Sequence, residues 1–315
     1  MDASPRRTRA QRKAVLTEES GHSTRNQDAS VNTTARQFTG LSLNLKPTED
    51  TAIQSLRTSL ETLPEKLTAK GLELSPSDLK TVLKKQKWLR TYTISLTDDD
   101  ASLRPIVDAT LVFGQEEAGT AICISGDGLL LTCSHCVAET EAELDLDKKH
   151  VLLFASGKVV RAKFMAWDGK RDLALLQIVE AQGPSDILFP SIAVAARPPK
   201  SRDPLVCVGH PGSEDLETIL PGIKTNYDTL HVSTGVFRGY VKGQDLQDNS
   251  EIGALKHDCW TYWGHSGAPL ASRVSGQLIG LHSSWDDSTG MRRGIPVGAI
   301  REFLREHSVL DDSEK

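Results

Sequence analysis

The sequence has no long apolar run, no apolar stretch near its N-terminus and no large excess of charge of either sign. No segment approaches the roughly 20 apolar residues that span a bilayer, and the N-terminus lacks the apolar core of a signal peptide. Lys and Arg number 37 against 42 Asp and Glu, so no general affinity for nucleic acid or membrane follows. We therefore expect neither partner, and an intracellular protein of the cytoplasm or the nucleus.

Cysteine is scarce and its count is odd. Five cysteines without a secreted context favour reduced thiols over a disulfide framework: Cys123, Cys133, Cys136, Cys207 and Cys259. A zinc site would combine Cys133 and Cys136 with His257 or Cys259, but two Cys-x-x-Cys pairs at metal spacing are missing. Buried thiols are the preferred interpretation, and we expect no metal and no cofactor.

The 315 residues have room for one two-lobed domain of about 200 residues and an N-terminal appendage. Residues 1–46 are rich in Ser, Thr, Arg, Asn and Gln and poor in large apolar residues, which predicts a disordered basic tail. The basic cluster between residues 6 and 13 has two other interpretations, a nuclear address or a weak mitochondrial one.

Residues 47–97 are predicted to form a short helical segment. Apolar residues recur every three or four positions from Ile53 through Leu63 to Leu67, with an interruption near Pro64. Ser75 and Pro76 then supply a cap and a proline at the first helical position, opening a second helix. We expect the apolar faces to pack on the rest of the chain; pairing with a second copy or holding a partner are the alternatives.

From residue 98 to about residue 310 the pattern changes to many short apolar runs separated by Gly and Pro. Strand-like patterning begins at Pro105-Ile106-Val107 and continues almost without helix, which implies an all-β domain. The apolar residues after Pro296 have helical spacing and predict a C-terminal helix over about 297–308.

The stretch Tyr-Trp-Gly-His-Ser-Gly-Ala-Pro-Leu, residues 262–270, places a serine between two glycines. In a tight turn the amides of Gly264 and Ser266 can converge beside the Ser266 hydroxyl, which is the layout of an oxyanion hole next to a nucleophile. Ser266 is therefore the candidate nucleophile. For this motif alone, an ordinary Gly-Ser loop is the alternative.

A serine hydroxyl needs a base to take its proton, and that base is usually a histidine oriented by a buried carboxylate. His135 lies at the end of an apolar strand that follows the turn Ser-Gly-Asp-Gly of residues 125–128. Asp172 lies at the start of the apolar run 173–178, which suits a buried carboxylate. Asp168 is the second candidate, and it is weaker because it precedes a Gly-Lys-Arg turn.

Three sequence blocks carry a resemblance to a known family. Gly-Thr-Ala with Leu-Thr-Cys-Ser-His-Cys-Val, then Asp-Leu-Ala-Leu-Leu, then Gly-His-Ser-Gly-Ala-Pro-Leu with Leu-Ile-Gly-Leu occur in the order of trypsin-like serine proteases of the chymotrypsin fold. The chain resembles their HtrA-like and glutamyl-endopeptidase-like branches more closely than digestive trypsins. The resemblance covers roughly residues 105–305, and the residues after Ser266 leave no space for the PDZ domain of HtrA proteases.

This resemblance implies two six-stranded Greek-key β-barrels, about 105–190 and about 200–296. It also implies a serine endopeptidase acting on protein or peptide, with His135 as general base, Asp172 as its orienting carboxylate and Ser266 as nucleophile. The alternative function is a catalytically silent module that binds a peptide or serves as a scaffold. A lipase-type hydrolase would need the chain order Ser, Asp, His, whereas the order here is His, Asp, Ser.

The resemblance to glutamyl endopeptidases also implies a pocket for the substrate side chain. Its residues here are Thr261, five positions before the nucleophile, and His282, with Ser283 next to it. A hydroxyl and an imidazole can both hydrogen-bond an acidic side chain, and the imidazole can carry the opposite charge. Viral proteases that prefer Gln resemble the same pairing, so Glu, Asp and Gln before the scissile bond all stay open.

His265 occupies the position where secreted trypsins have an Asp that pairs with a newly cleaved N-terminus. A neutral imidazole cannot form that ion pair, which predicts an oxyanion loop that folds without zymogen cleavage. A second catalytic base is the alternative interpretation, but direct adjacency to Ser266 points the ring away from the hydroxyl.

Overall fold

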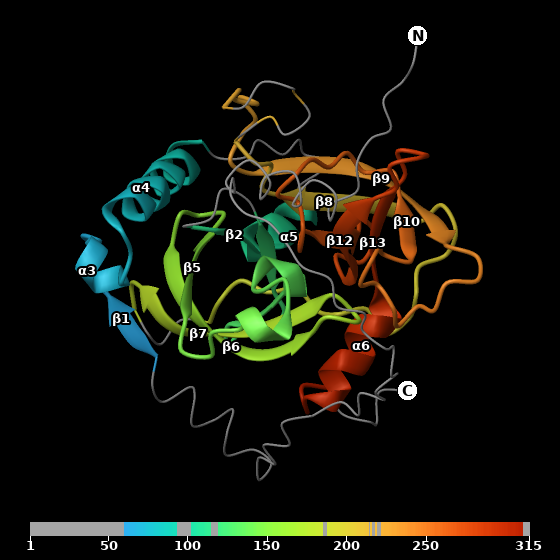
Figure 1. Cartoon of the computed structure of the whole chain (residues 1–315), viewed down its shortest axis with the longest axis horizontal. Helices are drawn as coiled ribbons and strands as arrows, with labels where there is room; N and C mark the ends of the chain where they lie inside the picture. Colours follow the sequence, from blue (N-terminus) through green and yellow to red (C-terminus); the bar gives the residue numbers. More distant parts are fainter. Residues whose placement is uncertain are drawn as a thin grey trace, which may run out of the picture.

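The computed structural model describes residues 60–92, 102–114, 119–184, 188–213, 215, 218 and 222–310. Two closed antiparallel β-barrels of six strands each lie side by side (Figure 1). The all-β fold with two barrels and a C-terminal helix is therefore confirmed. The predicted disordered tail over 1–46, and residues 47–59 and 93–97 of the predicted helical segment, lie outside the described residues.

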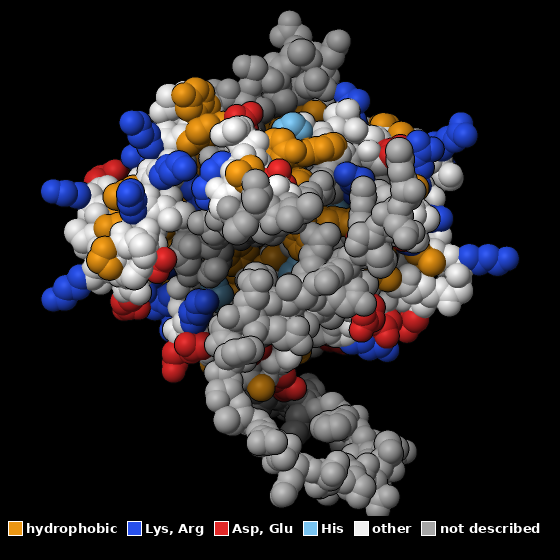
Figure 2. All heavy atoms as spheres, turned by 45° about the horizontal axis from the view of Figure 1, so that its top comes forward, with side chains coloured by type: hydrophobic (Ala, Val, Ile, Leu, Met, Phe, Trp, Pro, Cys, Tyr) orange, Lys and Arg blue, Asp and Glu red, His pale blue; other side chains and the backbone are white. Residues whose placement is uncertain are grey.

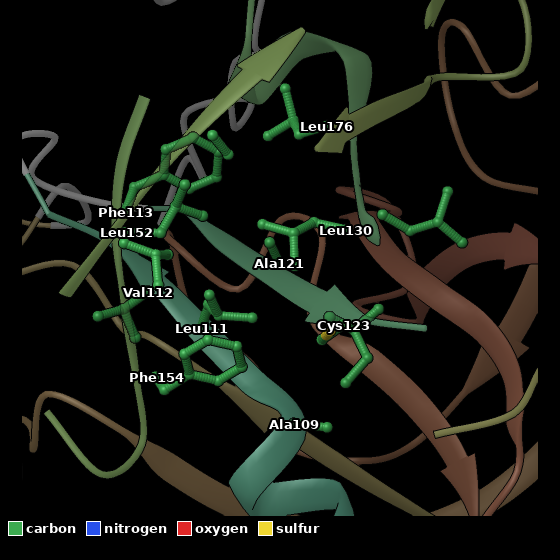
Figure 3. Packing of buried hydrophobic residues seen from close by; sticks show 14 of the residues in the cluster. Ala109, Leu111, Val112, Phe113, Ala121, Cys123, Leu130, Leu152, Phe154 and Leu176 are labelled. Carbon is green, nitrogen blue, oxygen red and sulfur yellow. The ribbon is translucent and has the colours of Figure 1, made fainter. Parts of the chain in front are cut away.

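The first barrel closes in the order β7-β4-β3-β2-β5-β6, with β6 also paired to β7. Register shifts along the long pair β6–β7 provide the bends that closure of a small barrel requires. Its interior is filled by apolar side chains from facing strands, among them Leu111, Ala121 and Leu130 (Figure 3). Its strands are β2 (Thr110–Phe113), β3 (Thr120–Cys123), β4 (Leu129–Thr132), β5 (Lys149–Phe154), β6 (Val159–Asp168) and β7 (Leu173–Gln182).

The second barrel closes in the order β10-β13-β12-β11-β8-β9. It is followed directly by helix α6 (Val297–Glu306), whose Ile300, Phe303 and Leu304 are fully buried. Its strands are β8 (Pro204–Gly209), β9 (His231–Tyr240), β10 (Leu255–His257), β11 (Pro269–Ser272), β12 (Leu278–Trp285) and β13 (Arg292–Pro296).

The N-terminal segment packs on the first barrel, as expected. It contains α3 (Ala69–Leu72) and α4 (Pro76–Thr91), and the side chain of Ser75 accepts a hydrogen bond from the amide of Asp78 as the predicted cap. On the inner face of α4, Lys85 donates to the carbonyl oxygen of Phe113 at 2.7 Å, and Gln86 donates to that of Gly157 at 3.0 Å. The inner face of α4 is thus packed against the first barrel of the same chain.

Two secondary-structure predictions are wrong. The helical spacing through Leu63 predicts a helix, but Glu61–Leu63 form strand β1, which pairs in parallel with β7. Pro105-Ile106-Val107 were predicted to begin a strand, but they belong to helix α5 (Arg104–Ala109), which buries Ile106 and Val107. Apolar runs this short are compatible with either structure, and packing decides between them.

The surface agrees with the near balance of charge. Lys and Arg side chains project from several parts of the edge of the face in Figure 2, with acidic side chains between them. None of the helices in the described residues is long and apolar enough to cross a membrane.

Candidate active site

The loop that carries Ser266 is fastened to the first barrel by its backbone. The carbonyl oxygen of Gly264 accepts hydrogen bonds from the amide of Gly119 at 3.1 Å and the hydroxyl of Thr120 at 3.0 Å, and that of Ser266 accepts from the amide of Thr120 at 2.9 Å. Gly264 and Gly267 have φ angles of 101° and 81°, a region that favours glycine. The two glycines of the motif therefore set the path of the loop.

The amides predicted to form the oxyanion hole are those of Gly264 and Ser266. Neither donates a hydrogen bond to a backbone carbonyl within the described residues. The flanking amides do find acceptors, since His265 donates to Tyr262 and Gly267 donates to His282. Two donors next to the candidate nucleophile are thus left for a ligand oxygen.

His135 and Asp172 are brought together at the edge of the first barrel. His135 lies in a 3-10 turn (Ser134–Cys136) that follows β4, and its Nδ1 is 2.8 Å and 3.0 Å from the two carboxylate oxygens of Asp172. The same carboxylate accepts from the hydroxyl of Ser134 at 2.9 Å and the amide of His135 at 3.3 Å. Both side chains are nearly buried, so the ring is held in one orientation.

The turn that carries Asp172 is strained and clamped. Asp172 has φ of 56°, a left-handed conformation that is uncommon for a residue with a side chain. Its neighbour Arg171 binds Asp168 at 2.6 Å and Glu306 of α6 at 2.7 Å, which holds the turn against the C-terminal helix. Asp168 is therefore engaged by Arg171, and the carboxylate that contacts His135 is that of Asp172.

The hydroxyl of Ser266 does not bond to His135 in this structure. Ser266 Oγ donates to the carbonyl oxygen of Ser283 at 3.4 Å instead. The two residues are still neighbours, because Cys136 next to His135 places its sulfur 3.5 Å from the carbonyl oxygen of Ser266. All three predicted triad residues thus share one site, with the Ser–His hydrogen bond not made.

Comparison with known proteins identifies the family of the chain. A family model described as trypsin-like peptidase domain matches residues 119–281, just over half of the chain, and spans His135, Asp172 and Ser266. The chain belongs to this family. It is a serine-type endopeptidase, a hydrolase whose substrates are proteins or peptides. Among solved structures it is similar to the serine endoprotease from Yersinia pestis, with 19% identity, 68% of each chain covered and a TM-score of 0.48.

In the peptidase site the negative charge of Asp172 stabilises the charged form of the His135 ring. Burial lowers the pKa of His135, but the negative charge of Asp172, together with the Cys136 sulfur, outweighs burial and raises it. Burial raises the pKa of Asp172, and His135 outweighs this and lowers it. A hydrogen bond from Cys133, opposed by burial and helped by the charge of His135, lowers the pKa of Cys136.

The predicted pocket residues lie on the second barrel and are almost fully buried. Thr261 is 3% exposed and its hydroxyl oxygen has no hydrogen-bond partner. His282 is 2% exposed, and its Nδ1 is 3.1 Å from Nε2 of His257. Burial and the neighbouring charges of His257 and His265 lower the pKa of His282 well below its usual value. The lowered pKa favours the neutral ring of His282 near pH 7, so the expected opposite charge stays a prediction for the complex with an acidic side chain.

His265 is fully buried behind the nucleophile loop of the peptidase. Its Nδ1 is 3.2 Å from the amide nitrogen of Tyr262 and 3.1 Å from the carbonyl oxygen of the same residue. Burial and the nearby His231 lower the pKa of His265 to about 3, so the ring is neutral. A neutral ring bonded to its own loop fits an oxyanion loop that needs no ion pair.

The alternative of a zinc site, with Cys133, Cys136 and His257 or Cys259 as ligands, finds no such cluster among the described residues. Within the described residues, the group that comes nearest to a metal site is Cys133, His135 and Asp172, whose ligand atoms lie within 4.8 Å of one another. His135 and Asp172 already bond to each other there, and Cys133 is fully buried. All five cysteines are free thiols.

The sequence did not reveal several residues that hold the site together. Ser134 donates to Asp172, Arg171 clamps its turn, and Trp167 donates from Nε1 to the carbonyl oxygens of Ser134 and Ala138 at 3.2 Å and 3.3 Å. Their positions beside His135 and Asp172 were visible, but neighbours in a loop face many directions. Their spacing along the sequence does not distinguish these side chains from ones that face solvent.

Proposed function

We propose that the peptidase cleaves its substrate through a triad of His135, Asp172 and Ser266 and a covalent acyl-enzyme. The observation that carries this proposal is the contact of His135 Nδ1 with both oxygens of Asp172, on a turn that also approaches the loop of Ser266. This contact fixes which ring nitrogen carries the hydrogen and leaves Nε2 to act as the base.

The reaction begins when Ser266 Oγ turns from Ser283 toward Nε2 of His135. His135 accepts the hydroxyl proton as Oγ attacks the peptide carbonyl, and Asp172 stabilises the charged imidazole. The amides of Gly264 and Ser266 bind the developing oxyanion, and losing one such donor typically costs about 100- to 1000-fold in rate. His135 then protonates the leaving amine, and water attacks the acyl-enzyme to release the product.

Thr261, His282 and Ser283 form the proposed pocket for the side chain before the scissile bond. Thr261 brings a buried hydroxyl without a partner, and the carbonyl oxygen of Ser283 lies 3.4 Å from Ser266 Oγ. The unpartnered Thr261 hydroxyl can donate to a side-chain oxygen, which Glu, Asp and Gln all carry. The pocket accordingly selects Glu, Asp or Gln.

A peptide library varied at the residue before the scissile bond tests both proposals. We expect the wild-type chain to cleave after Glu, Asp or Gln, Ser266→Ala to cleave nothing, and the exposed-site control Ser275→Ala to match wild type. Ser266-dependent cleavage after other residues would retain the triad and reject the pocket. Folded wild-type protein that cleaves no peptide would reject the triad and favour a binding module.

The packing of the N-terminal helices limits how two copies of the chain could associate. The inner face of α4 is used within the chain, so a second copy would have to bind its other side, where Leu83 and Tyr92 are exposed. Light scattering of the intact chain tests this arrangement, and a monomer at all concentrations would exclude it.

A further inference from the structure

Arg292 lies beside the proposed pocket. It is the first residue of β13, opposite Trp285 of β12 and His257 of β10. Its Nη2 donates to the carbonyl oxygen of Thr261 at 3.4 Å, and its Nη1 donates to that of Gly290 at 2.8 Å. The guanidinium is therefore in contact with the residue whose hydroxyl the pocket uses.

The charge of Arg292 has no acidic partner within the described part of the chain. The next residue, Arg293, binds Asp286, and Arg238 of β9 binds Asp258, whereas Arg292 forms no ion pair there. Its Nε is buried and has no hydrogen-bond partner. A half-buried guanidinium that lacks a carboxylate leaves both charge and donors uncompensated, which costs free energy. A carboxylate brought by a ligand would compensate both.

The neighbouring histidines cannot supply a positive charge to the pocket. Burial, together with the other histidines and Arg292, lowers the pKa of His282 well below its usual value. Burial and nearby positive groups also lower the pKa of His257 and of His265 to about 3. Near pH 7 all three rings are neutral, and a neutral ring hydrogen-bonds a carboxamide as well as a carboxylate. Discrimination of Glu from Gln therefore needs a different group, a permanent cation.

We propose that Arg292 binds the side-chain carboxylate of the residue before the scissile bond, with the Thr261 hydroxyl as a second donor, and makes the peptidase select Glu or Asp over Gln. This inference rests on the proposed pocket of Thr261 and His282. A guanidinium binds a carboxylate through parallel hydrogen bonds and stays charged throughout the range in which proteins fold. His282 then acts as a neutral hydrogen-bonding wall of the pocket.

The first test compares kcat/KM for peptides that differ only in having Glu or Gln before the scissile bond. The wild-type chain is expected to prefer Glu by about 10- to 100-fold, the range that one charge-assisted contact supplies. In Arg292→Gln the ratio falls to about one while cleavage after Gln is retained, and Arg292→Lys restores part of the preference. Arg238→Gln, which removes an exposed arginine of the same barrel, is the matched control and keeps the wild-type ratio.

The pH dependence separates Arg292 from a histidine as the source of selectivity. With Arg292 the Glu-to-Gln ratio stays constant from pH 6 to pH 9, because neither the guanidinium nor the substrate carboxylate titrates there. A ratio that falls as the pH rises through about 6.5 would assign the charge to a histidine and overturn the proposal. An unchanged ratio in Arg292→Gln would overturn it as well.

A binding measurement keeps this test independent of the triad. Calorimetry on Ser266→Ala, with and without Arg292→Gln, measures the affinity for uncleaved peptides that carry Glu or Gln at the same position. Tighter binding of the Glu peptide that depends on Arg292 supports the inference even where the catalytic assignment fails. Equal affinity for the two peptides in Ser266→Ala overturns it, whatever the catalytic rates show.

Discussion

The two barrels contribute opposite kinds of polar group to the active site. On the first-barrel side, the carboxylate of Asp172 accepts from Ser134 and from the ring and amide of His135, so its lone pairs are occupied. On the second-barrel side, the Thr261 hydroxyl and the Nε of Arg292 are buried without partners. The first side is complete without substrate, whereas the second side is incomplete until a ligand binds. Substitutions on the first-barrel side should therefore lower the catalytic rate, and substitutions on the second-barrel side should lower the discrimination between substrates.

The largest effect is expected from Asp172→Asn, which changes the hydrogen-bonded pair of His135 and Asp172 on the first-barrel side. The carboxamide offers a donor to Nδ1 of His135 where a carboxylate accepts, so it holds the wrong tautomer of the base. We expect kcat to fall about 10,000-fold with the fold retained. Steady-state kinetics on the best library peptide and circular dichroism measure the two properties.

Asp168→Asn is the matched control, because Asp168 binds Arg171 at the other end of the same turn. It is expected to lose less than about tenfold, as a partly exposed ion pair contributes little. Similar losses in both variants would mean that the turn, and not the carboxylate of Asp172, matters for the rate.

The completed side was largely predictable from the sequence. His135 lies shortly after β4 and Asp172 directly before β7, next to apolar runs that predict strands, and the order of the three motifs along the chain restricted the fold. The α4 helix was predictable for a local reason, because Ser75 caps it and Pro76 starts it. Local signals and the order of motifs were enough where each residue acts with close neighbours.

The contribution of Arg292 to the incomplete side was not predictable, because it depends on long-range pairing. Adjacent residues of a strand point to opposite faces, so Arg292 and Arg293 have different partners although the sequence presents them as equivalent. Only the register of β12 with β13 shows which of the two lies against Thr261. Strand β1 was missed for the same reason, since its pairing with β7 spans more than 100 residues.

The two sides meet at Gly267, where Gly267→Ala should have the next largest effect. An added Cβ would lie 2.1 Å from the carbonyl oxygen of Thr120 and 2.4 Å from the hydroxyl of Thr132, at a positive φ. We expect the free energy of unfolding to fall by about 3 kcal/mol, from the clash and the strained backbone together. Urea denaturation measures the change from the midpoint and slope.

Gly276→Ala is the control for backbone strain alone. Gly276 also has a positive φ, of 70°, but an added Cβ there would meet nothing within 4 Å. It should cost about 1 kcal/mol. Equal losses at Gly267 and Gly276 would show that the junction between the two barrels tolerates the extra atom.

A smaller effect on the free energy of unfolding is expected when the pH is lowered, because the second barrel buries neutral histidines. The pKa values of His257 and His265 are about 3 in the folded state because burial disfavours the charged ring, against about 6.5 in an unfolded chain. Below pH 6.5 the unfolded chain binds more protons, so the free energy of unfolding falls as the pH drops toward 3. Each such ring should cost about 1.4 kcal/mol at pH 5.5. Urea denaturation between pH 7.5 and pH 5 measures the slope, and His265→Asn should reduce it; an equal slope in both proteins would contradict the assignment.

The smallest effect is predicted on the first-barrel side, where the sulfur of Cys136 raises the pKa of His135. Burial lowers the pKa of His135, Asp172 raises it most strongly, and the Cys136 sulfur raises it further. Because the neutral ring is the active base, a raised pKa places the acid limb of the rate profile at higher pH. Cys136→Ala should therefore move the acid limb of kcat/KM to lower pH, by about half a unit. Cys123→Ala, which alters a buried thiol inside the first barrel, should leave the limb in place. A shift in the opposite direction would mean that the sulfur acts on His135 through packing and not through charge.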